Sequence, residues 1–304
     1  THDQSSAASD VYKRQLATFI VQSQGSNFPD FVNIDYGGEK RISQFMDIYL
    51  PNRNKDSYPV VIVIHGSGWR ANNKKSSDYG RYVFVNPLTE KNFAVAIINH
   101  RSSTLDSIFP AQIHDVKAAV RYLRAKAKDL NLDTSFIGIT GYSSGGHLAA
   151  LAGTSSYDQS VEGNVGEFLN FSSHIDAVVD FYGPTDMSVF DDCLKRMGKE
   201  FKSPRKIPLF DNFVDQVPKE VQRANPIKYI KENSPPFLIF HGENDLTVPI
   251  CQSKILHEAL LKKGINSELI IDKNGDHCGN NLMPHHTSKM VNFFSTTLKS
   301  KYEN

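Results

Sequence analysis

One stretch of the sequence constrains the fold more than any other, because it joins an apolar strand to an apolar helix through a very tight turn. Residues 136–139 have the composition of a buried strand and lead into Gly141-Tyr142-Ser143-Ser144-Gly145, followed by a helical apolar pattern. Glycine is needed on both sides of Ser143 because side chains there would collide with the strand or the helix. The turn exposes the Ser143 hydroxyl and places the Ser144 backbone N–H at a helix start, where a developing negative charge is favoured.

The rest of the chain alternates between strand-like and helix-like segments. Apolar runs without polar alternation predict strands covered on both faces, and they occur at 60–64, 94–98, 177–181, 237–240 and 269–271. Apolar residues at three- and four-residue spacing predict helices, which we place around 113–127, after Ser143, over 252–262 and through 290–298. This order predicts an α/β fold with a mostly parallel, doubly wound sheet and right-handed crossovers.

Several segments lie outside that alternation. Residues 1–27 are polar and are interpreted as an N-terminal tail or a short docking helix. Segments 31–36 and 45–50 alternate around a glycine-containing turn, which predicts an antiparallel N-terminal hairpin at the sheet edge. The polar stretch at about 185–234 carries several phenylalanines and predicts a lid-like insertion, with surface decoration as the alternative. We therefore expect a single domain over 28–304 that contains this insertion.

Composition and charge narrow the classes of partner. Apolar residues make up 39% of the 304 residues, as in a soluble globular protein with a sizeable core. The 34 basic and 33 acidic residues nearly cancel, which argues against nucleic acid and membrane surfaces as partners. No apolar run reaches the length of a membrane-spanning helix. Because the sequence opens at Thr1 without methionine, we expect a removed signal peptide and a secreted or periplasmic location, with the cytoplasm as the alternative.

The stretch over 136–148 resembles the nucleophile elbow of α/β-hydrolases, and residues 133–139 are similar to the lead-in of their esterase branch. The resemblance covers roughly residues 31–300 and implies an α/β-hydrolase fold with Ser143 as the nucleophile. One alternative is a strand, turn and helix without chemistry, since the short motif also arises by chance. Another is Ser144 as nucleophile, which the glycine register disfavours. His147 lies one helical turn beyond Ser143 and is interpreted as a packed structural histidine.

A second motif, His65-Gly66-Ser67-Gly68-Trp69, follows the first central apolar run. It resembles the His-Gly-Gly-Gly oxyanion loop of esterases, with serine in place of the central glycine. The resemblance implies that a backbone N–H of Gly66, Ser67 or Gly68 joins that of Ser144 in holding the oxyanion. Among the three, Ser67 is our choice.

Two aromatic residues beside these motifs are candidate substrate-binding residues. Trp69 is the single tryptophan of the chain and is interpreted either as a core anchor or as a wall of the acyl or leaving-group pocket. Tyr142, directly before the nucleophile, is also assigned to substrate binding. His65 is expected to brace the oxyanion loop rather than transfer a proton.

An activated serine requires a base and a carboxylate that orients the base. The loop after 237–240 resembles the acid loop of these hydrolases, with Asp245 as its carboxylate, and the loop after 269–271 looks like their histidine loop, with His277 as the base. Both follow strands, where a doubly wound sheet builds its site. Weaker candidates remain for each role: Glu243, Asp272 and Asp276 for the acid, and His285 and His286 for the base.

The three cysteines, Cys193, Cys251 and Cys278, are too few for a disulfide scaffold or a CxxC metal site, so no metal is expected. If the triad is right, Cys251 and Cys278 lie on neighbouring loops. A disulfide between them is one hypothesis, and free buried cysteines are the alternative that we favour.

Within the family, these motifs are most similar to bacterial carbohydrate esterases of the acetyl xylan and feruloyl kind. The resemblance implies a serine esterase that acts on a small-molecule or oligosaccharide ester through an acyl-enzyme, without a cofactor. A formamidase or amidase and a general short-chain carboxylesterase remain alternatives, because pocket shape alone separates them, and kynurenine formamidase is a cousin in motif. A peptidase would be expected to carry a further large domain, and a catalytically silent binding domain would lack a triad member. The sequence does not predict an oligomeric state.

Overall fold

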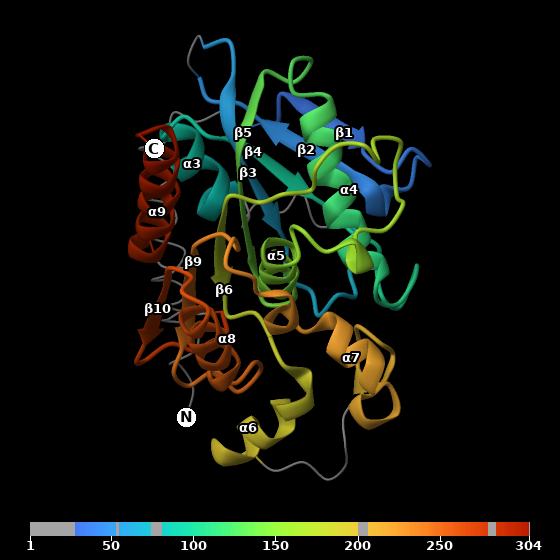
Figure 1. The fold of residues 1–304 in the computed structure, drawn as a ribbon, viewed down its shortest axis with the longest axis vertical. Helices are drawn as coiled ribbons and strands as arrows, with labels where there is room; N and C mark the ends of the chain where they lie inside the picture. The colour runs from blue at the N-terminus through green and yellow to red at the C-terminus, as the bar shows by residue number, and fades with distance from the viewer. Residues whose placement is uncertain (1–27, 53–54, 74–80, 200–205, 279–283, 304) are drawn as a thin grey trace, which may run out of the picture.

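The computed structural model describes residues 28–52, 55–73, 81–199, 206–278 and 284–303. The predicted N-terminal tail over 1–27 lies outside these residues. Elements of secondary structure cover each apolar run that the sequence assigned to the sheet. The elements and their arrangement are shown in Figure 1.

An eight-stranded sheet forms the centre of the molecule. The antiparallel neighbours are β1 with β2 and β2 with β4, and the remaining neighbours are parallel. This confirms both the mostly parallel sheet and the N-terminal hairpin. In spatial order the strands are β1 (Phe31–Asp35), β2 (Phe45–Tyr49), β4 (Ala94–Ile98), β3 (Tyr58–Ile64), β5 (Leu132–Tyr142), β6 (Ala177–Phe181), β9 (Phe237–Gly242) and β10 (Ser267–Asp272).

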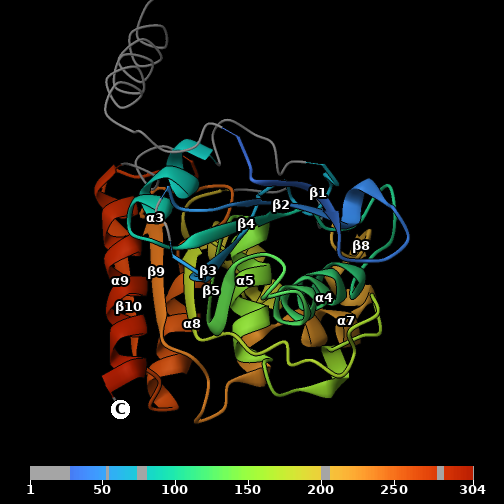
Figure 2. The same cartoon turned by 90° about the horizontal axis from the view of Figure 1, so that it is seen from above.

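Helices cover both faces of the sheet (Figure 2). On one face lie α3 (Asn86–Glu90) and α9 (Pro284–Glu303), and on the other lie α4 (Ala111–Ala125), α5 (Ser144–Thr154) and α8 (Cys251–Lys262). Strand β3 shows why its sequence is apolar throughout: Val60 and Ile62 pack into one core, whereas Val61 and Val63 pack into the other. Short helical turns join these elements: η1 (Ile42–Gln44), η2 (Arg81–Val85) and η3 (Gln159–Val161).

The segment at about 185–234 folds at the carboxyl-terminal end of the parallel strands, where α6 (Phe190–Arg196) and α7 (Pro218–Ala224) lie in Figure 1. Its interior is anchored, because Leu209 and Phe210 are buried and the Phe210 ring packs edge-on against Phe109 at 6.0 Å between centroids. This part of the segment therefore belongs to the hydrophobic core of the domain. It contains η4 (Met187–Val189), α6 (Phe190–Arg196), β7 (Lys206–Ile207), β8 (Asn212–Phe213), η5 (Val214–Gln216), α7 (Pro218–Ala224) and η6 (Pro226–Tyr229).

The cysteine pairing differs from both expectations. Cys251 at the start of α8 is bonded to Cys193 of α6, with 6.1 Å between the Cα atoms, and Cys278 is a free, exposed thiol. The hypothesis of a Cys251–Cys278 bond is therefore wrong, and so is the alternative of free buried cysteines. The insertion folds back so that Cys193 lies beside Cys251, directly after the acid loop. These residues are far apart in the sequence, and their spacing does not predict that they meet.

Candidate active site

Ser143 stands between β5 and α5 in a strained backbone conformation, with φ 55° and ψ −124°. Such a conformation costs a non-glycine residue about 1–3 kcal/mol and persists only where the surroundings enforce it. Here a Cβ at Gly145 would overlap the carbonyl oxygen of Ile64, and a Cβ at Gly141 would overlap the backbone of Gly145. The two glycines are therefore required by close packing around the turn, as the sequence indicated.

The three residues assigned to the triad meet in space. Ser143 Oγ lies 3.0 Å from His277 Nε2, and His277 Nδ1 lies 2.7 Å from Asp245 Oδ2. Asp245 follows β9 and His277 follows β10, two parallel neighbours whose carboxyl ends lie side by side. Both distances are those of hydrogen bonds, so the arrangement can move a proton from the serine hydroxyl to the imidazole.

Asp245 is fully buried and is held as an anion. Its Oδ1 accepts the backbone N–H groups of Thr247 and Val248, each at 2.8 Å, and His241 Nε2 lies 3.3 Å from its Oδ2. Burial by itself would raise the pKa of Asp245, but hydrogen bonds from His241 and His277 lower that pKa to about 2. The carboxylate is thus charged throughout the neutral range and can stabilise a protonated His277.

Two residues that sequence reasoning left without a role support the triad. The ring of Tyr182 lies against His277, with 4.8 Å between centroids, and Tyr182 itself has φ 46° and is buried. His241 is also buried, with Nδ1 at 2.6 Å from Ser253 Oγ. In the sequence, each of these residues comes directly after an apolar run that was predicted to be a strand. That position at a strand end was the available signal for a role in the site.

The weaker candidates for the triad have other surroundings. Glu243 and Asp276 are exposed, and Asp272 accepts the backbone N–H of Asn274. His286 is buried against the ring of Phe240. The side chain of His285 lies outside the described part of the structure.

The oxyanion loop is tied to the elbow by a side chain. The backbone N–H of Ser67 donates to Ser144 Oγ at 2.9 Å, so the donor that we chose from the sequence is already engaged. Gly66 packs closely on Tyr142, whose carbonyl oxygen would lie 2.6 Å from a Cβ at Gly66. Gly68 and Ser144, by contrast, both line the pocket beside Ser143.

Trp69 belongs to the core and also lines the pocket, so its position is compatible with both interpretations of it. Its indole Nε1–H donates to His147 Nδ1 at 3.2 Å, while His147 Nε2 lies 2.8 Å from the carbonyl oxygen of Ala224. Burial lowers the pKa of His147 to about 4, so this histidine is neutral at physiological pH. The interpretation of His147 as a structural residue agrees with these contacts.

Tyr142 and His65 lie away from the pocket. The Tyr142 ring stacks against Phe84, with 5.9 Å between centroids, within the core on the α3 and α9 face. It is not among the described pocket-lining residues, and this position runs against the substrate-binding role predicted for it. Tyr142 ends β5 whereas Ser143 lies in the turn after it, so a position next to the nucleophile in the sequence does not imply a position beside the substrate. His65 is buried and stacks on His100 at 4.8 Å, consistent with its expected place in the loop support.

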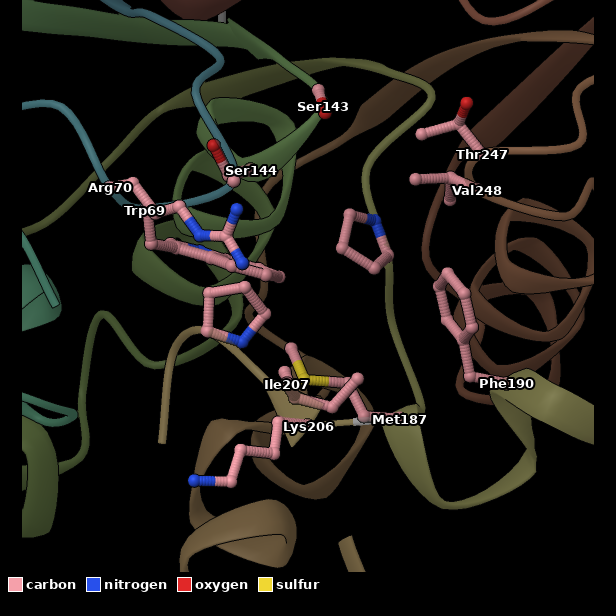
Figure 3. A pocket seen from close by; sticks show the side chains of 13 residues that line it. Trp69, Arg70, Ser143, Ser144, Met187, Phe190, Lys206, Ile207, Thr247 and Val248 are labelled. Atoms are coloured by element: carbon pink, nitrogen blue, oxygen red, sulfur yellow. The ribbon is translucent and has the colours of Figure 1, made fainter. Parts of the chain in front are cut away.

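The pocket in front of Ser143 has a volume of about 400 Å³ (Figure 3). The predicted insertion contributes one wall, and Thr247 and Val248 of the acid loop contribute another. Phe190 was among the phenylalanines that marked the insertion in the sequence, whereas Arg70 and Lys206 carried no sequence signal. The lining residues are Gly68, Trp69, Arg70, Ser143, Ser144, Pro184, Met187, Phe190, Lys206, Ile207, Pro208, Thr247 and Val248.

The described residues contain neither a membrane-spanning helix nor a metal cluster. None of the helices in the described ranges combines the length and the apolar character needed to cross a membrane. No group of three or more histidine, cysteine, aspartate or glutamate side chains in those ranges could hold a metal ion.

Comparisons with known proteins identify the family of the chain. The model of the BD-FAE family matches residues 46–260. The chain is similar to esterase LipQ of Mycobacterium tuberculosis, with 31% identity over 211 residues, which is 68% of this chain and 46% of LipQ. It therefore spans about half the length of that curated relative.

Two solved structures are also similar. A bifunctional GH43-CE of Bacteroides eggerthii is 42% identical with a TM-score of 0.81, covering 88% of this chain and 35% of that one. A truncated form of a carbohydrate esterase from gut microbiota is 35% identical with a TM-score of 0.81, covering 91% of this chain and 99% of that one. With its central sheet, nucleophile elbow and family match, the chain belongs to the BD-FAE family of α/β-hydrolases.

Proposed function

We propose that this protein is a serine hydrolase that cleaves carboxylic esters of carbohydrate through an acyl-enzyme. The observation that carries the proposal is the chain of hydrogen bonds from Ser143 through His277 to the buried Asp245. The solved relative that the alignment covers almost completely is a carbohydrate esterase, which supports the substrate class. No cofactor is part of the proposal, because fixed dipoles and the triad supply the charge stabilisation.

The geometry suggests how each residue acts. His277 Nε2 accepts the proton of Ser143 as Oγ attacks the ester carbonyl, and the Asp245 carboxylate stabilises the resulting imidazolium. We assign the oxyanion to the backbone N–H groups of Gly68 and Ser144, which line the pocket. His277 then protonates the departing alcohol, and a water molecule deprotonated by His277 releases the acid and restores Ser143.

The pocket is consistent with removal of an acetyl or feruloyl group. Met187, Phe190 and Ile207 bring apolar surface from the insertion to face the nucleophile, and Val248 adds more from the acid loop. We propose that the insertion acts as a wall or lid over the acyl or sugar group. This role would follow from its contribution to the lining, since ligand pockets are mostly apolar with a few polar groups that fix orientation.

We also propose that the protein works in an oxidising compartment, either secreted or periplasmic. The Cys193–Cys251 disulfide supports this location, because structural disulfides persist outside the reducing cytosol.

The test is hydrolysis of p-nitrophenyl acetate, butyrate and octanoate, together with acetylated xylan and methyl ferulate, by wild type and Ser143→Ala. We expect activity on short-chain esters, release of acetate or ferulate, and a loss of at least about a thousandfold in the variant. Activity confined to N-formyl amides would replace the esterase proposal by a formamidase. Wild-type ester activity that survives in Ser143→Ala would overturn the assignment of the nucleophile.

A further inference from the structure

The pocket that contains Ser143 carries two positively charged side chains, Arg70 and Lys206, and none of its described lining residues is acidic. Both side chains are exposed, and neither has an ion-pair partner within the described residues. The whole chain has a formal net charge of only +1, so the positive character is a local property of this pocket.

The backbone fixes Arg70 next to the oxyanion loop. Gly68 and Trp69 both have φ 60°, so the chain reverses just before Arg70. The N–H of Arg70 donates to the carbonyl oxygen of Ser67 at 3.2 Å, and the Ser102 hydroxyl donates to the carbonyl oxygen of Arg70. In Figure 3 the guanidinium extends past Trp69 toward the middle of the pocket. A left-handed conformation at tryptophan is costly, so the fold maintains this presentation against strain.

Lys206 lies at the other end of the pocket. It is on β7, which is paired with β8; Ile207 of the same strand is buried, and so are Leu209 and Phe210 after it. Figure 3 shows its side chain at the end away from Ser143, with the ammonium directed outward. Lys206 can therefore attract an anion at the entrance, whereas Arg70 can contact one beside the reacting ester.

The chemistry of the Arg70 and Lys206 side chains indicates which class of substrate the pocket can bind. Arginine and lysine side chains only donate hydrogen bonds, whereas the hydroxyl groups of a neutral sugar are also bound by acceptors such as carboxylates and amides. The described lining contains no carboxylate or amide side chain that could supply such acceptors. A guanidinium matches a carboxylate in both charge and geometry, because two parallel N–H groups meet two oxygens.

We propose that the pocket binds esters of acidic sugars, in which a uronic acid carboxylate near the ester pairs with Arg70 while Lys206 attracts it from the entrance. This inference rests on the proposed carbohydrate esterase function and names the substrate class of the same site.

The experiment compares two probes of nearly the same shape, one with a charged carboxylate and one with a neutral amide: the methyl glycoside of tri-O-acetyl-glucuronic acid and the matching uronamide. Wild type should cleave the acid with a kcat/KM about tenfold above that of the amide, through a lower KM. Arg70→Gln should bring the two kcat/KM values to within about twofold of each other, and Arg70→Lys should keep an intermediate preference for the acid. Lys206→Gln should reduce the preference for the acid less than Arg70→Gln does. Lys262→Gln, an exposed lysine at the end of α8, is the matched control and should retain the full preference.

A second measurement does not depend on any variant folding. Raising the salt concentration to about 0.5 M should compress the wild-type preference for the acid, because ions screen an exposed charge pair. Equal kcat/KM for the acid and the amide in wild type would overturn the acidic subsite and leave the carbohydrate esterase function standing. Cleavage of p-nitrophenyl acetate without cleavage of either glycoside would overturn both.

Discussion

The backbone N–H of Ser67 donates a hydrogen bond to Ser144 Oγ at 2.9 Å, so a side chain of the nucleophile elbow holds the oxyanion loop in place. We predict that Ser144→Ala lowers kcat on p-nitrophenyl acetate by about tenfold with little change in KM. The loop would lose the contact that sets its distance from Ser143, and oxyanion donors act only in the transition state.

Ser295→Ala is a matched control, because this serine hydroxyl donates to the Val291 carbonyl oxygen within α9, away from the site. The control should keep both kcat and KM. An unchanged or increased kcat in Ser144→Ala would show that the bond does not position the loop.

The charge and acceptor geometry of Asp245 yield a second prediction. Asp245→Asn should lower kcat by about a thousandfold to ten-thousandfold, because the imidazole of His277 loses its orienting carboxylate and its preferred tautomer. The measurement is p-nitrophenyl acetate hydrolysis at neutral pH, where the carboxylate with its pKa of about 2 is fully charged in wild type. Glu243→Gln, at an exposed alternative acid, should retain activity. The reverse ranking of these two variants would reassign the catalytic acid.

A buried carboxyl outside the triad should make stability depend on pH. Asp180 is fully buried in β6, and burial raises its pKa to about 7, although the N–H of Gly183 donates to Oδ1 at 2.9 Å. Above the ordinary aspartate pKa of 3.8 the unfolded state releases the Asp180 proton, whereas the folded state keeps it up to about pH 7. The free energy of unfolding that Asp180 contributes therefore falls as the pH rises from 3.8 to about 7. Asp180→Asn keeps the shape and removes the titration. The variant should gain more stability over wild type at about pH 8 than at about pH 5.

Urea unfolding of both proteins at the two pH values measures that difference. A gain of equal size at both values would mean that Asp180 does not titrate in this range.

The disulfide should contribute to both stability and the pocket. Cys193→Ser should lower the free energy of unfolding by about 2–4 kcal/mol, because the bond closes a loop with a sequence separation of 58. We also expect KM to rise, since Phe190 on the same helix α6 lines the pocket. Cys278→Ser, at the exposed free thiol, should leave stability unchanged. Three titratable thiols in unfolded, non-reduced protein would contradict the pairing.

Much of the fold could be predicted because it is encoded in local patterns. The run at 94–98 became β4 with the same bounds, since a strand covered on both faces must be apolar at every position. The bounds of β5 were less well predicted. It begins at Leu132 rather than at residue 136, because Leu132 and Asp133 pair with Tyr58 and Pro59 before the register shifts ahead of Ile137.

The sequence by itself determined the glycine-flanked turn at Ser143 and the order of strands and helices, and its resemblance to esterases pointed to Asp245 and His277. These features depend on short motifs whose backbone demands are local. Only the tertiary structure decided that Ser144 engages Ser67, that Cys251 bonds Cys193 and that Arg70 and Lys206 share one pocket. Each of these arrangements brings together segments far apart in the chain, and the packing of whole helices and strands sets their approach, which no local sequence pattern predicts.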